Sequence, residues 1–156
     1  MSEYSWKSSG VRYEDRPDLQ ELVTPKAVGF KTPLRDGSER SGIFEMNYSV
    51  ADQVADNFRN LVMTNYGERL GNPSFGANLR PLVTDYTSID DFESAAMERI
   101  QTAVTNFLPA VELDTFVSKF IDDNDPGLLV LELNIKYNIP KLNVLGRVLT
   151  VTFTII

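Results

Sequence analysis

The residues best placed to do chemistry are Glu68 and Arg69, which are adjacent in a loop rich in glycine and proline. Gly67 suits left-handed backbone and Asn72-Pro73 is typical of a turn, so the loop over residues 64–82 should hold both side chains in a defined place. A carboxylate next to a guanidinium can form a local salt bridge, bind a polar partner or take part in acid–base catalysis.

Two interpretations of this loop stay open at the level of residue types. In the first, Glu68 accepts hydrogen bonds from amides of the loop and pairs with Arg69 or Arg80, which makes a staple internal to the loop. In the second, Glu68, Arg69 and Arg80 are partner-binding residues that contact neighbouring proteins of an assembly.

The composition removes most enzymatic chemistry. The 156 residues include no histidine and no cysteine, so the commonest general base, most zinc ligands and the thiol nucleophile are absent. The acidic turn at residues 122–125 invites a calcium hypothesis. However, Asn134 stands at the twelfth position from Asp123, where a calcium-binding loop has its bidentate glutamate. We therefore predict no metal and no cofactor.

The distribution of charge indicates a protein partner. Residues 1–41 hold seven basic and seven acidic residues, so the whole net charge of −7 falls on residues 42–156. This excess of acid argues against nucleic acid and against an anionic membrane as partners. No apolar run approaches the roughly 20 residues of a membrane span, and the N-terminus lacks the apolar core of a signal peptide. We expect the chain to be made in the cytoplasm.

Residues 1–41 show no sustained helical or strand period and contain several prolines and glycines. They are either a disordered tail or an arm that lies along a partner. Trp6, the only tryptophan, favours the arm and is its candidate partner-binding anchor. The predicted organisation is an extended N-terminal arm over residues 1–41 and one α+β domain over residues 42–156.

Two helices are predicted in that domain. After a short strand at about residues 42–47, Ser49 should cap the first helix with Asp52 as its capping-box partner. Ser88 should cap the second, which carries carboxylates in its first turn and is stopped by Pro109. Apolar residues recur at helical spacing in both, as in Phe58, Leu61 and Val62 of the first and Phe92, Ala96 and Ile100 of the second.

From Val111 onward the apolar period changes to two, which predicts strands. The first runs to Phe120 or Ile121, the second covers residues 129–139, and the third follows Pro140 and Gly146. The predicted fold class is therefore α+β, with two helices packed on one face of a small antiparallel sheet.

The last strand is the second candidate site. Between Val148 and Ile156 there is no charge, no proline and no glycine. Natural edge strands are blunted by lysine, proline or bulges, so this strand is either interior to the sheet or completed by a strand from another polypeptide. Its candidate partner-binding residues are Val148, Thr150, Val151, Thr152, Phe153 and Thr154.

The order of these features resembles the baseplate wedge or sheath-initiator family of contractile phage tails and related injection machines. The resemblance runs from about Gly29 to the C-terminus. It is carried by Thr-Pro-Leu-Arg-Asp-Gly at 32–37, Thr-x-x-Gly-Glu-Arg at 64–69, Asn-Pro-x-Phe-Gly at 72–76, Leu-Arg-x-Leu at 79–82 and Asn-Phe-x-Pro at 106–109.

The resemblance implies a structural protein of the virion that sits in the tail baseplate and docks the first tail sheath subunits by β-strand augmentation. It implies other baseplate wedge proteins, and central tube or hub proteins, as further partners. Relatives commonly carry Glu-Pro-Arg where this chain has Leu108-Pro109-Ala110. We expect the turn to be kept there, and either an apolar contact with the core or a compensating partner surface to replace the charges.

Members of the family have also been described as lysozyme-like, which gives an alternative from another class. In it, Glu68 is the acid of a glycoside hydrolase and Asp85 or Asp90 is the second carboxylate. The arginine beside Glu68 should lower its pKa and make it a poor acid. We therefore predict a protein that is not an enzyme.

Overall fold

The computed structural model describes residues 26–37, 43–85, 89–122 and 129–155. Predictions for Trp6, for the cap Ser88 and for the acidic turn after Asp122 lie outside these residues. The elements in chain order are β1 (Gly29–Phe30), β2 (Met46–Asn47), α2 (Val50–Met63), α3 (Arg80–Asp85), α4 (Ile89–Phe107), β3 (Glu112–Asp122), β4 (Leu129–Ile139), η2 (Pro140–Leu142) and β5 (Val144–Ile155).

The larger sheet is a meander with the order β3-β4-β5 and antiparallel neighbours throughout. Leu133 of the central strand lies opposite Ser118 on one side and Val151 on the other. Leu133 and Ile135 are fully buried while Lys136 is exposed, as expected for a sheet with one covered face. The α+β class and the three predicted strands are confirmed.

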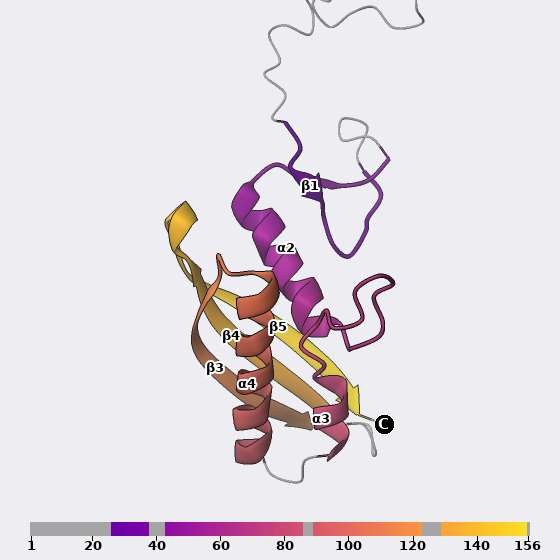
Figure 1. Cartoon of the computed structure of the whole chain (residues 1–156), viewed down its shortest axis with the longest axis vertical. Helices are drawn as coiled ribbons and strands as arrows, with labels where there is room; N and C mark the ends of the chain where they lie inside the picture. The colour runs from indigo at the N-terminus through magenta and orange to yellow at the C-terminus, as the bar shows by residue number, and fades with distance from the viewer. Residues whose placement is uncertain (1–25, 38–42, 86–88, 123–128, 156) are drawn as a thin grey trace, which may run out of the picture.

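The helices lie on one side of this sheet (Figure 1). α2 and α4 confirm the two predicted helices, and α3 is a third that the sequence analysis missed. Pro81 stands in the first turn of α3, where its missing N–H would have no helical partner anyway. α4 contacts β3, and both α2 and α3 contact β5.

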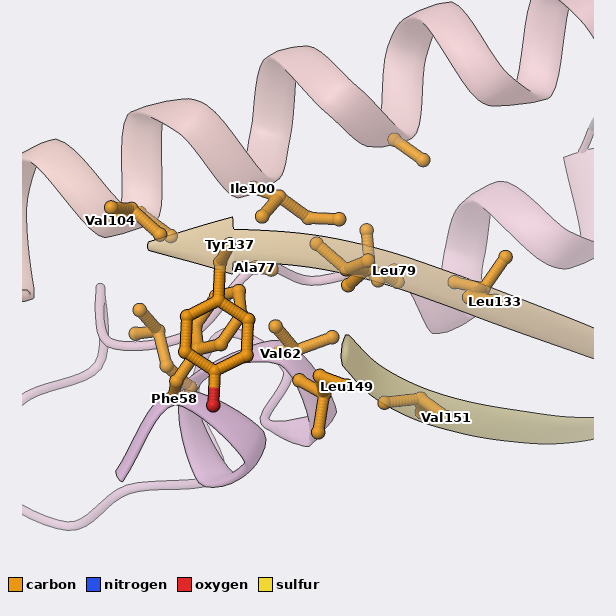
Figure 2. Packing of buried hydrophobic residues seen from close by; sticks show 14 of the residues in the cluster. Phe58, Val62, Ala77, Leu79, Ile100, Val104, Leu133, Tyr137, Leu149 and Val151 are labelled. Carbon is orange, nitrogen blue, oxygen red and sulfur yellow. The ribbon is translucent and has the colours of Figure 1, made fainter. Parts of the chain in front are cut away.

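The core forms between the helices and the covered face of the sheet. Figure 2 shows Phe58 of α2 against Tyr137 of β4, with ring centroids 4.9 Å apart at an interplanar angle of 63°. Val104 of α4 and Val151 of β5 are also almost fully buried. Each large apolar side chain buried here contributes roughly 1.5–3 kcal/mol, which fixes the helices against the sheet.

The predicted capping box at the start of α2 is wrong. Ser49 is the N-cap residue, but its side chain makes no capping hydrogen bond. Asp52 instead accepts a hydrogen bond from Arg147 of β5, with Nη2 and Oδ1 2.6 Å apart. Asp52 therefore fixes α2 to the sheet and does not close its own first turn.

A second, two-stranded sheet joins β1 to β2 beside the start of α2. Lys31 pairs with Glu45 across it, Nζ to Oε1 at 2.7 Å. Asp56 of α2 accepts hydrogen bonds from the backbone N–H of Thr32 (3.0 Å) and from Nδ2 of Asn47 (2.7 Å), which anchors this sheet to the helix. The paired strands lie on either side of residue 41, which is the predicted end of the N-terminal arm. The extent of the arm stays a prediction.

Candidate strand-docking interface

β5 lies at an edge of the sheet. It pairs with β4 on one side, and no backbone hydrogen bond joins it to any other element within the described parts of the chain. Its residues from Val148 to Phe153 include no charged side chain. Of the two sequence alternatives for the last strand, an interior position is therefore excluded for the described residues.

The opposite edge shows which backbone groups of β5 point outward. Ser118 of β3 donates its N–H to Oε1 of Glu93 (2.7 Å), so that N–H points away from β4. In an antiparallel ladder, opposed residues alternate between exchanging two hydrogen bonds and exchanging none. Leu133 therefore turns its hydrogen-bonding groups toward Val151. The groups that point outward belong to the alternate residues Val148, Thr150, Thr152 and Thr154.

The β3 edge is protected against pairing with a further strand, in contrast to the β5 edge. Glu93 of α4 accepts from both the N–H and the hydroxyl of Ser118, each at 2.7 Å. Lys119 adds an exposed cation, and a register shift between Leu113 and Thr115 interrupts the β3–β4 ladder. The β4–β5 ladder also shifts, between Val144 and Arg147, but it is regular from Arg147 to Ile155. Charges and bulges are the usual protection of an edge against pairing, so the sheet offers β5 for docking and not β3.

Two hollows flank the outer side of β5. The Phe153 hollow, about 450 Å³, is lined by Thr152, Phe153 and Thr154 together with residues of α2, α3 and the loop between them, among them Met63 and Arg80. The Arg59 hollow, about 530 Å³, is lined by Arg147, Val148 and Leu149 together with residues of α2, among them Arg59 and Asp52. Tyr137 of β4, Lys31 and Asn47 complete the lining of the Arg59 hollow. Consecutive residues of β5 line each hollow, so both hollows lie beside this strand.

The loop residues Glu68, Arg69 and Arg80 do not form one cluster: Glu68 and Arg80 line the Phe153 hollow beside β5, and Arg69 does not. Glu68 accepts hydrogen bonds from the N–H (2.7 Å) and from Nδ2 (2.8 Å) of Asn65. These bonds, with a smaller contribution from the charge of Arg80, hold the pKa of Glu68 below its ordinary value.

Arg69 does not pair with Glu68 within the described residues. Its guanidinium lies over the ring of Phe75, 4.2 Å from the centroid, in a cation–π contact. Phe75 in turn packs against Phe107 of α4, with ring centroids 5.1 Å apart. The hydrogen bonds of Glu68 match the local interpretation of the loop, while the role of these residues in partner binding stays a prediction.

The geometry around Glu68 does not resemble a carboxylate pair for glycoside hydrolysis. Glu68 is exposed and its lowered pKa opposes a role as proton donor. It lines two hollows, and neither has a second carboxylate among its described lining residues. The described residues also contain no group of three acidic side chains able to hold a metal ion. No described helix is long and apolar enough to cross a membrane.

The turn at Leu108-Pro109-Ala110 has a compact geometry. The N–H of Leu108 donates to the carbonyl of Val104 (2.8 Å) and the N–H of Val111 donates to the carbonyl of Leu108 (3.0 Å). The side chain of Leu108 packs against the core. The expected apolar contact at this corner is confirmed.

Two solved structures share this fold. One is a chain of the six-fold symmetrised baseplate of the anti-feeding prophage, with a TM-score of 0.56 and 18% identity over 70% of this chain and 82% of that chain. Another, from Geobacter sulfurreducens and provisionally described as a tail lysozyme, has a TM-score of 0.50 and 18% identity over 69% of this chain and 90% of that chain.

A chain of the baseplate complex from the type VI secretion system gives a TM-score of 0.42 and 18% identity over 69% of this chain and 94% of that chain. No protein-family model and no curated protein matches the sequence. At this level of identity, the likeness to the anti-feeding prophage and Geobacter chains establishes a common fold.

Proposed function

We propose that this protein is a structural component of the baseplate wedge of a contractile tail, and that it initiates the tail sheath. A strand from the first sheath subunit pairs with the outer edge of β5. The protein thus acts in the virion tail after assembly in the host cytoplasm, and it has no enzymatic role.

The unpaired edge of β5 carries this proposal. Its outward N–H and C=O groups, at Thr150 and Thr152 among others, present the hydrogen-bonding pattern of an incomplete ladder. A strand added there satisfies those groups, and its side chains enter the flanking hollows. The fold shared with a baseplate chain of the anti-feeding prophage agrees with such a place in the assembly.

The loop over residues 64–79 is the proposed contact with other baseplate wedge proteins. Leu70 is fully exposed and Tyr66 is half exposed, next to Glu68 and Arg69. The segment that leads into β2 also exposes apolar side chains, including Ile43 at 81%. Exposed apolar groups of this kind suit burial against neighbouring subunits or against central tube or hub proteins.

Proline at Thr152 tests the docking proposal directly. Because the N–H of Thr152 points outward, Thr152→Pro removes a docking donor and leaves the β4–β5 ladder intact. We expect the cognate sheath protein to fail to assemble on baseplates that carry Thr152→Pro. Thr152→Ala, which keeps the N–H, is the matched control and should support normal sheath.

Circular dichroism and thermal unfolding must first show that the Thr152→Pro protein is folded. Sheath of normal length on such a folded variant would refute docking through β5. A turbidity assay on purified peptidoglycan tests the absence of enzymatic activity: cleavage that disappears in Glu68→Gln would establish a hydrolase.

A further inference from the structure

The two hollows beside β5 differ in the chemistry they offer to a docked strand. Met63, Val83 and Phe153 give the Phe153 hollow apolar walls, and Met63 is 46% exposed there. A large apolar side chain that enters this hollow covers the exposed part of Met63, which is favourable in proportion to the apolar area removed from water.

The Arg59 hollow presents a cation that has no partner among the residues that the structure describes. Of the other charged residues that line it, Arg147 pairs with Asp52, Lys31 pairs with Glu45, and Asp56 accepts two hydrogen bonds. The guanidinium of Arg59 makes no hydrogen bond or ion pair with any residue that the structure describes. An acidic side chain is the complementary group, because a carboxylate can accept two parallel hydrogen bonds from arginine.

The register of β5 sets the distance between these two features. Leu149 lines the Arg59 hollow and Phe153 lines the other, and both residues face the helices. Four residues of strand span about 13 Å at roughly 3.3 Å per residue. Since side chains alternate between faces, a docked strand running in either direction places residues i and i+4 over the two hollows.

We propose that the strand which docks on β5 carries an acidic residue and a large apolar residue four positions apart. The acidic residue lies against Arg59 and the apolar residue fills the Phe153 hollow. This inference rests on the proposed function, since it specifies the sequence that the β5 edge selects.

Synthetic peptides of about nine residues, long enough to cover the edge of β5, test this pattern. Each consists of alternating threonine and valine, with glutamate and leucine substituted four positions apart in one order or the other. Controls place the two residues three apart, which sends one to the opposite face, or replace glutamate by glutamine. Binding to the full chain is followed by NMR shifts of the Thr150 and Thr152 amides.

We expect one of the two four-apart peptides to bind at least about tenfold more tightly than its three-apart and glutamine controls. Arg59→Gln should abolish the preference for glutamate over glutamine and keep the preference for leucine. Met63→Gln should do the reverse. Arg69→Gln is the matched charge control, because Arg69 stacks on Phe75 and lines neither hollow, and it should change nothing.

Two failures can be told apart. Equal binding of all peptides, again blocked by Thr152→Pro, would show an edge that accepts strands without selecting them, and would overturn this inference alone. If no peptide at millimolar concentration shifts the Thr150 and Thr152 amides, the edge does not accept strands and the proposed function falls as well.

Discussion

Arg147 at the start of the edge strand is bonded to the first turn of α2: Nη2 lies 2.6 Å from Oδ1 of Asp52, and Nη1 lies 3.0 Å from the carbonyl oxygen of Ala51. The bond to Asp52 raises the pKa of Arg147. The two contacts connect residues 95 and 96 positions apart, so they hold the edge strand at a fixed distance from the helix beside it.

Replacing Arg147 by methionine should lower the free energy of unfolding by about 0.5–1.5 kcal/mol, because the ion pair is partly exposed and the bond to Ala51 is lost too. Urea denaturation measures the change. Lys136→Met is the control, since its ion pair with Asp114 at 3.1 Å lies on the uncovered face of the sheet. Equal losses in both variants would contradict a special role for Arg147.

Proline should affect the stability of the protein very differently at two adjacent positions of β5. Val151→Pro removes an N–H that bonds β4 and distorts a strand beside the core, so we expect a loss of about 3 kcal/mol or more. Thr152→Pro should leave the thermal midpoint nearly unchanged, because its N–H points outward. If both variants unfold alike, the assignment of outward groups along β5 is incorrect.

Removal of Glu93 should open the second edge of the sheet. Glu93→Ala leaves the N–H and hydroxyl of Ser118 without their acceptor, which should cost about 1.5–3 kcal/mol and promote self-association. Sedimentation velocity over a range of concentrations measures the association. Glu98→Ala, an exposed carboxylate on the same helix, should remain like wild type. A Glu93→Ala protein of unchanged stability and mass would refute this function of Glu93.

Gly76 should tolerate no side chain. Its φ is +118°, and a Cβ there would stand 2.2 Å from the backbone oxygen of Thr64, so Gly76→Ala must displace the end of α2. We expect a loss of several kcal/mol, on the order of 3 or more, in chemical denaturation. Gly71→Ala provides the comparison, since φ there is +84° but no atom lies within 4 Å. That variant should lose only about 1 kcal/mol.

The Asn65–Glu68 contact should give a pH dependence with a defined sign. Because the folded state lowers the pKa of Glu68 from 4.5, the contact stabilises the fold above that value, and its contribution is lost as the pH falls through the folded pKa. An NMR titration of the Glu68 carboxyl carbon measures this pKa. In Asn65→Ala it should move up toward 4.5, and an unchanged value would contradict the assigned cause.

The strands and the two long helices could be predicted because their patterns are local. Apolar residues alternate over residues 129–139, and Phe58, Leu61 and Val62 recur at helical spacing. Each pattern indicates which face of its element is buried. α3 was missed because six residues that include Pro81 carry too short a pattern, and its position depends on burying Leu82 against the core.

The candidate site could be predicted only in part, because its geometry depends on long-range contacts. The uncharged composition of the last strand predicted a free edge or an interior position, and the pairing order decided between them. From the sequence alone, Glu93 is one of the carboxylates that stabilise the start of a helix. Its bond to Ser118, 25 residues away, exists only because α4 packs against β3. No local pattern marks such a residue.

The hydrogen bonds from Ser118 to Glu93 make the two edges of the sheet different. A three-stranded sheet whose β3 edge is bonded to a helix side chain and whose β5 edge is open is expected to grow by a fourth strand on the β5 side. Repeated around a ring, such units would all face the same way, so a polymer that begins on them would inherit a single direction of growth.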